Sequence, residues 1–254
     1  MNPTSEAVLA ARRARRILAP LGAAAPVDVQ AGYVAQHALA EAMGALPPAG
    51  FKIGATTRQM QVLLGLSGPA AGFVPVEGLV PNGGAVPFAR YLRPGVECEI
   101  GVRLGTDLPA GPCTAEAAAA CVAEVFAAIE IVENRYENLA ALGTPTLVAD
   151  QMFHAGGVPG HAPADWRSVD LAAVRGRMWV DGTLRGEGVG GDLLGHPMNA
   201  LAWLAASPAA AVFGGLRAGQ VVFLGSVTPP IWIDAPAEIL VAFDRLGEVR
   251  LSFT

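Results

Sequence analysis

The chain has 254 residues, of which 52% are apolar and only 15% are charged. This share of apolar residues is enough to bury a sizeable core, either in one large domain or in one domain with a small helical extension. The formal net charge of -5 gives no electrostatic reason to expect nucleic acid or an anionic membrane as a partner.

Several general features favour a cytoplasmic protein. Residues 1–10 lack an apolar segment followed by a small-residue cleavage site, so no signal peptide is expected. No uninterrupted apolar stretch reaches the roughly 20 residues that span a bilayer. Cys98, Cys113 and Cys121 are odd in number and lack metal-ligand spacing, which favours small buried thiols. So apolar a chain also predicts a homo-oligomer, because subunit contacts would cover apolar surface.

The first part of the chain is predicted to be helical. Residues 5–45 are rich in Ala and Leu, and Pro20 and Pro26 separate two segments. The second of these segments is predicted over about 27–43. A basic run near the start is interpreted as the solvated face of the first helix, since like charges usually face water. The run consists of Arg12, Arg13, Arg15 and Arg16.

A short strand is predicted at 51–54, where Lys52 points away from the apolar residues on either side of it. From about residue 72 onward, short apolar runs alternate with Gly and Pro turns, which is typical of a β-rich body. We therefore predict the α+β class. A helical N-terminal part at 1–71 would pack on a β-rich catalytic core at 72–254, and the two together could count as one domain.

Within the core, strict alternation predicts a strand at 96–104, and Thr114 is predicted to open an Ala-rich helix. The Asp-Gly pair at 181–182 predicts a hairpin, because it tolerates the positive φ that a tight turn needs. The glycine-rich run 186–191 lacks the flanking strand and helix of a phosphate loop, so it is interpreted as a flexible loop. Further elements are expected at 129–132 (strand), 197–206 (helix), and 220–224, 231–234, 238–244 and 249–253 (strands).

The sequence contains an unusual set of carboxylates. Glu97 and Glu99 project from the same face of the predicted strand, because side chains two residues apart point the same way. Two like charges so placed repel each other unless something positive lies between them. Glu130 stands alone in the apolar strand 129–132. Carboxylate oxygens suit Mg²⁺ or Mn²⁺, so the three glutamates predict a metal site; the simpler alternative is that the pair faces water.

Two histidines are further candidates for functional residues. His154 has a suitable pKa range for acid–base catalysis, and the alternative is a structural histidine in a loop. His196 precedes Pro197 at a predicted helix start, where a structural or capping role is favoured.

Six stretches of the chain resemble the fumarylacetoacetate hydrolase superfamily, and within it the 2-keto-4-pentenoate hydratase / 4-oxalocrotonate decarboxylase branch. They occur in the family's order, and together with the helical start and strand-rich end they make the resemblance close to full length. The stretches are 50–54, 96–100, 129–136, 148–150, 194–204 and 224–228. One departure lies after Asp150, where the family often has Asn and small polar residues. Here the run is Gln-Met-Phe-His at 151–154.

The resemblance implies a mixed β-roll core and a Mg²⁺ or Mn²⁺ ion held by the three glutamates. It assigns catalytic roles to Lys52, as a proton carrier, and to Asp150, whereas His154 is a catalytic candidate on its pKa range alone. It also suggests that Ser226 hydrogen-bonds the carboxylate of the substrate. The substrates it implies are short 2-oxo or 2-hydroxydienoic acids from the meta-cleavage of aromatic rings.

The leading functional prediction is a metal-dependent hydratase that adds water to a 2-hydroxydienoate of the 2-keto-4-pentenoate type and yields a 4-hydroxy-2-oxo acid. A 4-oxalocrotonate-type decarboxylase and an acylpyruvate C–C hydrolase are the alternatives, because the same metal site could serve all three reactions. A non-catalytic partner subunit is a further alternative, since hydratases and decarboxylases of this family can associate. The presence of Lys52 together with all three glutamates speaks against it.

Overall fold

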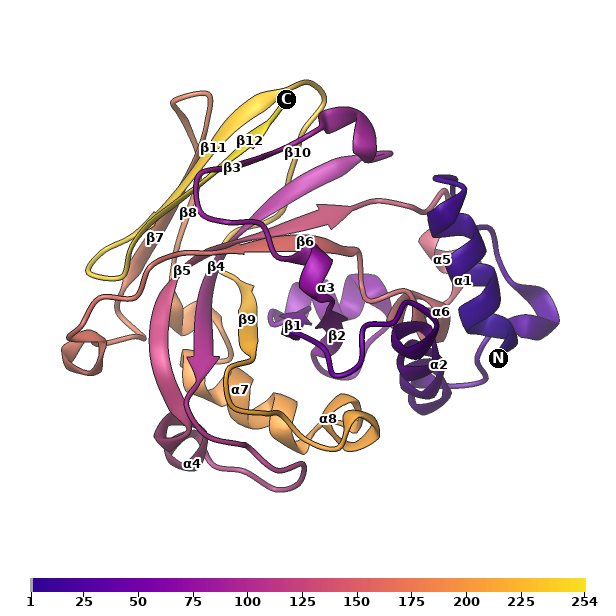
Figure 1. Ribbon diagram of the computed structural model, residues 1–254, viewed down its shortest axis with the longest axis horizontal. Helices are drawn as coiled ribbons and strands as arrows, with labels where there is room; N and C mark the ends of the chain where they lie inside the picture. Colours follow the sequence, from indigo (N-terminus) through magenta and orange to yellow (C-terminus); the bar gives the residue numbers. More distant parts are fainter. Residues whose placement is uncertain (1) are drawn as a thin grey trace.

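The computed structural model describes residues 2–254, in which two curled sheets are flanked by helices (Figure 1). The helices are α1 (Pro3–Arg13), α2 (Val29–Ala42), α3 (Arg58–Leu64), α4 (Ala115–Ala120), α5 (Leu139–Leu142), α6 (Thr144–Ala149), α7 (Pro197–Ala206) and α8 (Pro208–Phe213). The strands are β1 (Gly50–Gly54), β2 (Ala70–Val74), β3 (Gly84–Val86), β4 (Pro94–Leu104), β5 (Val122–Glu133), β6 (His154–Pro159), β7 (Arg175–Val180), β8 (Thr183–Val189), β9 (Val221–Ser226), β10 (Ile231–Trp232), β11 (Ala237–Phe243) and β12 (Gly247–Phe253). The predicted α+β class is confirmed.

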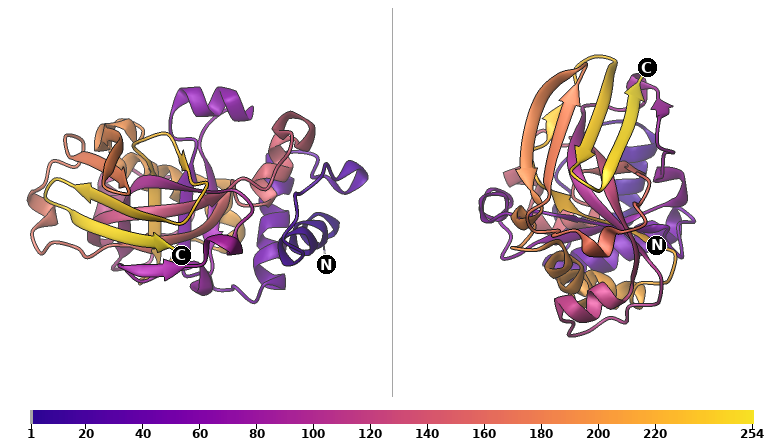
Figure 2. Two further views of the ribbon diagram at one scale, coloured as in Figure 1. Left: turned by 90° about the horizontal axis from the view of Figure 1, so that it is seen from above. Right: turned by 90° about the vertical axis from the view of Figure 1, so that its left-hand side faces the viewer.

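The two sheets pack against each other at the centre of the molecule. The larger sheet has the strand order β2-β1-β9-β4-β5-β6, with β10 paired to β4, and the smaller has the order β3-β12-β11-β7-β8. Figure 2 shows the strands of the smaller sheet side by side along one flank of the molecule. The long strands β4 and β5 form an antiparallel pair over their whole length. Both faces of this pair are covered, so most of its side chains are buried.

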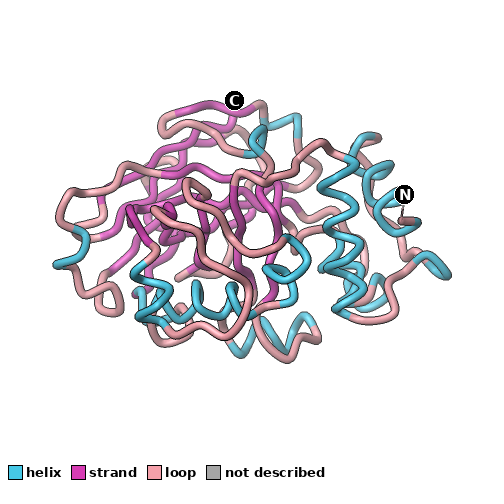
Figure 3. The backbone as a smooth tube through the Cα atoms, turned by 60° about the horizontal axis from the view of Figure 1, so that its bottom comes forward, coloured by secondary structure: helices cyan, strands magenta, loops and turns pink. Residues whose placement is uncertain are grey.

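The N-terminal helices lie at one end of the sheets, as the backbone trace shows (Figure 3). The Asn2 side chain accepts a hydrogen bond from the Thr4 N–H and so caps α1, and Asp28 caps α2 in the same way. The two predicted helical segments are thus confirmed. Among residues 2–254, no helix is both long and apolar enough to cross a bilayer.

Strand β1 joins the N-terminal part of the chain to the larger sheet. It pairs in parallel with β9 and antiparallel with β2. Close backbone approach is needed here: a Cβ atom added at Gly50 would lie 1.8 Å from the Val221 carbonyl oxygen. The proposed division at residue 71 thus falls within β2, and it stays a prediction.

Three local expectations need correction. The Ala-rich helix begins after Thr114 as predicted, but it ends at Ala120, and a strand starts at Val122 and includes the predicted strand 129–132. The run 186–191 is a continuation of β8 and a short 3₁₀ turn rather than a free loop, because residues 186–189 pair with β7. The three cysteines are free, but only Cys98 is fully buried.

Candidate metal centre

Three glutamates converge between β4 and β5. Glu97 lies directly opposite Glu130 in the register of the two strands, and Glu99 follows two residues along β4. One carboxylate oxygen of each residue lies within 4.8 Å of the corresponding oxygens of the other two. Glu99 and Glu130 are fully buried, and Glu97 is partly buried. The structure therefore brings the three predicted metal ligands together.

The electrostatics of this cluster are unfavourable without a cation. Burial and the neighbouring charge of Glu130 raise the pKa of Glu97 to about 8. Burial and the charges of Glu130 and Glu97 raise the pKa of Glu99 well above its usual value. Burial alone would also raise the pKa of Glu130, but the charge of Lys52 and a hydrogen bond from His154 outweigh it, so that pKa is lowered.

Two carboxylate oxygens of the cluster are left without a partner. Glu99 Oε2 accepts a hydrogen bond from the Gly225 N–H at 2.9 Å. Glu99 Oε1 and Glu130 Oε2, by contrast, are buried and have no hydrogen-bond partner in the part of the chain that the structure describes. Buried anionic oxygens are normally paired or bound to a metal. A set of three carboxylates with free oxygens fits a hard divalent cation such as Mg²⁺ or Mn²⁺.

Lys52 lies beside this cluster. Its side chain is only 2% exposed. Its Nζ donates a hydrogen bond to the Met152 carbonyl oxygen at 2.6 Å and lies 3.3 Å from Glu130 Oε1. A buried ammonium is tolerated only when it is paired in this way. The structure thus places Lys52, the predicted proton carrier, next to the glutamates.

A strained turn brings Met152 to Lys52. Gln151, Met152 and Phe153 all have positive φ, at 61°, 50° and 67°. The left-handed conformation costs about 1–2 kcal/mol for each such residue, so other contacts must hold the turn. The side-chain amide of Gln151 donates to the Phe73 carbonyl oxygen, and the backbone N–H of Met152 donates to Leu147. The turn therefore places one backbone carbonyl against the lysine.

His154 follows the turn and contacts Glu130. Its Nδ1 lies 2.8 Å from Glu130 Oε1, and its Nε2 is buried without a hydrogen-bond partner among residues 2–254. Burial lowers the pKa of His154, although the hydrogen bond with Glu130 opposes this. The ring is therefore neutral near pH 7. Because a carboxylate can only accept, we assign the ring proton to Nδ1, which leaves Nε2 as an acceptor.

Asp150 lies on the other side of the turn and holds it in place. Arg12 Nε is 2.6 Å from one carboxylate oxygen of Asp150, and Arg135 Nε is 3.0 Å from the other. The Tyr136 hydroxyl also donates to this carboxylate at 2.7 Å. Burial would raise the pKa of Asp150, but the two arginines outweigh it and the pKa is lowered. Among residues 2–254, the Asp150 carboxylate has no hydrogen bond or ion pair with Lys52 or with any of the three glutamates.

The surroundings of Asp150 correct one interpretation made from the sequence. Arg12 was expected on the solvated face of the first helix, yet it points inward to a partner 138 positions along the chain. The catalytic role of Asp150 stays a prediction; the structure shows its carboxylate held by Arg12, Arg135 and Tyr136. Arg135 and Tyr136 lie in the family-like stretch 129–136, but local sequence pattern gave no sign of their contacts with Asp150.

Ser226 lies at the end of β9, opposite Glu99 of β4. Its hydroxyl oxygen accepts hydrogen bonds from the backbone N–H groups of Cys98 and Thr228, both at 3.2 Å. The hydroxyl is thus engaged with the backbone, and its contact with a substrate stays a prediction. His196 caps α7, because its Nδ1 accepts a hydrogen bond from the Met198 N–H. This confirms the capping role predicted for His196.

The comparisons with known proteins agree with this arrangement. A family model described as fumarylacetoacetate (FAA) hydrolase C-terminal matches residues 56–254. The chain is 35% identical over 205 residues to a 2-keto-4-pentenoate hydratase from Burkholderia vietnamiensis, covering 81% of this chain and 78% of that protein. It is 32% identical over 247 residues to a 2-keto-4-pentenoate hydratase from Paraburkholderia phymatum, covering 96% and 94%.

A solved structure has the same fold over almost the whole chain. It is the 4-oxalocrotonate decarboxylase from Pseudomonas putida G7 in complex with magnesium and adipate, with a TM-score of 0.89 and 26% sequence identity. The match covers 99% of this chain and 96% of that one. The chain therefore belongs to the fumarylacetoacetate hydrolase family, and its curled sheets are of the type predicted from the resemblance.

Proposed function

We propose that this protein is a divalent-metal-dependent hydro-lyase. It would add water to a short 2-hydroxydienoate of the 2-keto-4-pentenoate type and yield a 4-hydroxy-2-oxo acid, as a step in the catabolism of aromatic rings by meta-cleavage. The observation that carries the proposal is the buried cluster of Glu97, Glu99 and Glu130 with two unpartnered oxygens beside a buried lysine. The hydratase names of its relatives support the reaction type.

The three glutamates would hold Mg²⁺ or Mn²⁺. When bound, such an ion supplies Lewis-acid catalysis at the oxygen-rich end of a 2-oxo acid. The chain's part is to hold the three carboxylates together in a largely buried site, where a bound cation would favour their deprotonated forms. Lys52 and the Gly225 N–H contribute by balancing the charge of Glu130 and Glu99.

Proton transfer would be carried out by Lys52 and His154. An ammonium group has three N–H donors, and two of those on Lys52 are directed to the Met152 carbonyl and to Glu130. The third is free to protonate a carbon or oxygen of the substrate. His154 Nε2 is the acceptor in the same site, so the two side chains together could deliver and remove the protons that ketonisation and hydration require.

A 4-oxalocrotonate-type decarboxylase is the second candidate. It is supported by the likeness over the whole chain to the solved decarboxylase. The glutamate cluster and Lys52 would suit either reaction, since loss of CO₂ from a β-keto acid needs the same electron sink.

Product analysis separates the candidates. The Mg²⁺-loaded protein would be incubated in turn with 2-hydroxypenta-2,4-dienoate, 4-oxalocrotonate and an acylpyruvate, and the products identified by mass spectrometry. We expect the mass of the dienoate to increase by one water. Loss of CO₂ from 4-oxalocrotonate with no hydration would favour the decarboxylase, and cleavage of the acylpyruvate would favour the C–C hydrolase. The Glu99→Gln variant would serve as the inactive control and Glu41→Gln, at an exposed position on α2, as the matched active one.

We further propose that the chain forms a homo-oligomer in the cytoplasm, and that it could associate with a neighbouring enzyme of its pathway. Several large apolar side chains are exposed in the single chain, including Val27 at 90% and Val62 and Leu63 at 67% each. Subunit contacts would remove such side chains from water. Light scattering after gel filtration at micromolar concentration tests this, and a monomeric mass would contradict it.

A further inference from the structure

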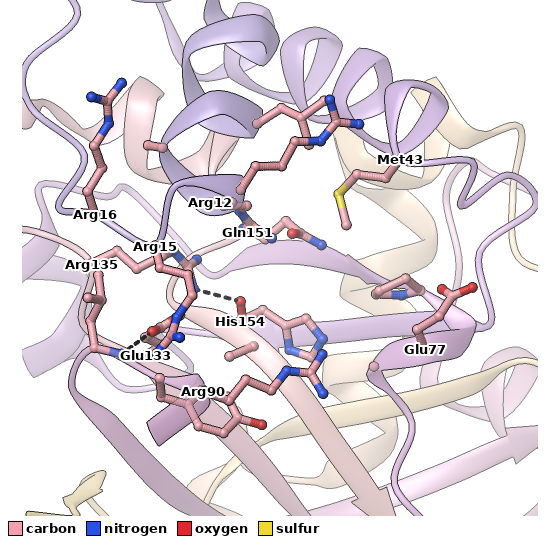
Figure 4. A pocket seen from close by; sticks show the side chains of 18 residues that line it. Arg12, Arg15, Arg16, Met43, Glu77, Arg90, Glu133, Arg135, Gln151 and His154 are labelled. Atoms are coloured by element: carbon pink, nitrogen blue, oxygen red, sulfur yellow. Dashed lines mark hydrogen bonds and ion pairs between the residues drawn. The ribbon is translucent and has the colours of Figure 1, made fainter. Parts of the chain in front are cut away.

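A cavity of about 500 Å³ lies where the end of α1 meets the turns before β3 and β4 and the start of β6 (Figure 4). Its charged lining is strongly basic. The charged residues are Arg12, Arg13, Arg15, Arg16, Arg90, Arg135, Glu77 and Glu133. None of the three glutamates of the metal cluster lines this cavity. The cavity lies beside the proposed active site, because His154, which contacts Glu130, forms part of its wall.

Most of this positive charge is not neutralised by the chain itself. Arg12 and Arg135 pair with Asp150, and Arg135 also pairs with Glu133. The other four arginines have no carboxylate within 4.0 Å among residues 2–254. These four arginines are exposed to water, and because no carboxylate of the chain pairs with them, they give the mouth of the cavity a positive potential that attracts anions.

The arginines come together from different parts of the chain. Arg15 lies just beyond α1 and donates a hydrogen bond to the Ala89 carbonyl, next to Arg90. Figure 4 shows Arg15, Arg90 and Arg135 on the side of the cavity near His154, whereas Glu77 lies on the opposite side. This arrangement leaves a basic side of the cavity at some distance from Glu77.

The lining indicates the kind of ligand. Guanidinium groups match carboxylate and phosphate groups in geometry and bind them through charge-assisted hydrogen bonds. Apolar side chains complete the wall, and a cavity of this volume suits a small metabolite. The apolar contributors are Leu9, Met43, Pro75, Tyr91 and Leu92. We propose that this cavity binds a small organic anion with two acid groups on a short carbon chain, at a site distinct from the metal cluster.

Calorimetric titration of the metal-free protein with glutarate, a five-carbon dicarboxylate, tests the proposal. We expect saturable binding at one site per chain, and weaker binding of propionate, which has a single acid group, at the same ionic strength. Inorganic phosphate should also bind more weakly than glutarate, because it has no carbon chain to contact the apolar wall. Absence of saturable glutarate binding, or tighter binding of phosphate, would overturn the proposal in this form.

Matched variants locate the binding. Arg90→Gln should weaken glutarate binding about tenfold or more, the usual effect of losing one charge-assisted hydrogen bond. Arg185→Gln is the control, because Arg185 is an exposed arginine on β8 outside this cavity. It should leave the affinity unchanged. If both substitutions weakened glutarate binding equally, the effect would be one of net charge alone, and the proposed site would be refuted.

A third variant separates this site from the proposed active site. Glu99→Gln should bind glutarate as the wild-type protein does, whether or not the protein proves to be a hydratase. Loss of binding in Glu99→Gln with retention in Arg90→Gln would place the ligand at the glutamate cluster and contradict the proposal. Melting temperatures of the unliganded variants show whether each is folded. If Arg90→Gln alone changes the glutarate affinity too little to measure, the Arg15→Gln/Arg90→Gln double variant should show a larger loss.

Discussion

The stability of the metal-free protein should depend on pH in a direction set by the glutamate cluster. The pKa of Glu97 is raised by burial and by Glu130, from an ordinary 4.5 to about 8. The folded state therefore binds this proton more tightly than the unfolded state does. The associated stability is fully present below about pH 4.5 and is lost as the pH rises through about 8. The metal-free protein should become less stable as the solution becomes more alkaline.

The size of this loss of stability follows from the shift in the pKa of Glu97. One pH unit corresponds to about 1.4 kcal/mol, so moving a pKa from 4.5 to about 8 corresponds to about 5 kcal/mol for a fully shielded carboxyl group. Glu97 is only partly buried, and contact with water screens its charge. We therefore expect about half of that amount: raising the pH should destabilise Glu97→Gln by roughly 2.5 kcal/mol less than it destabilises the wild type.

Urea unfolding of chelator-treated protein between about pH 5 and about pH 9 would measure this. The wild type should lose stability across the range, and Glu97→Gln should lose less. Glu41→Gln, at an exposed position on α2, should follow the wild type. Added Mg²⁺ should reverse the slope, because a metal binds the deprotonated carboxylates and competes with protons. Parallel curves for the wild type and Glu97→Gln would refute the electrostatic reasoning.

Three other substitutions test separate parts of the site. Lys52→Met should lower the rate of hydration by about 10²–10⁴-fold, the usual effect of losing an acid–base group, while Mn²⁺ binding measured by electron paramagnetic resonance persists; a rate near that of the wild type would exclude Lys52 as the proton carrier. Asp150→Asn should destabilise the protein by about 3–5 kcal/mol, because it removes the counter-charge of Arg12 and leaves the buried Arg135 paired with Glu133 alone, and an unchanged urea midpoint would contradict this. Ser226→Ala should raise KM for the dienoate more than it lowers kcat, as steady-state kinetics can show. An unchanged KM would show that the Ser226 hydroxyl contacts the backbone and does not bind the substrate.

Local sequence pattern was sufficient for much of the fold. The period of two along 96–104 correctly placed Glu97 and Glu99 on one strand, two residues apart. The hairpin around the Asp-Gly pair forms as expected, with β7 and β8 on either side. These features depend on neighbours in the sequence, which is why short-range reasoning could find them.

Features that depend on distant contacts were missed. The pairing of Arg12 with Asp150 joins residues 138 positions apart, so a run of arginines looked like an ordinary solvated face. The left-handed turn at 151–153 has no glycine, and its strain is held by contacts from other elements. Local pattern therefore gave no warning of it.

Intrinsic preference was also overruled in places. Alanine favours helix, yet the Ala-rich helix gives way to β5, because residues from Val122 onward pair with β4. Glycines at 186–191 indicated a loop, but they allow close packing instead. A Cβ added at Gly188 would lie 2.0 Å from the Val227 carbonyl oxygen. Glycine is needed at 188 because the backbone of Val227 lies too close to this ordered strand for a side chain.

Whether Glu97, Glu99 and Glu130 form one metal centre can be measured by titration with Mn²⁺. Electron paramagnetic resonance of the chelator-treated protein would count the bound ions, with Glu99→Gln and Glu41→Gln measured in parallel. We expect one Mn²⁺ per chain in the wild type and in Glu41→Gln, and binding weakened by at least tenfold in Glu99→Gln, which removes an anionic ligand. Equal Mn²⁺ binding by all three proteins would contradict it.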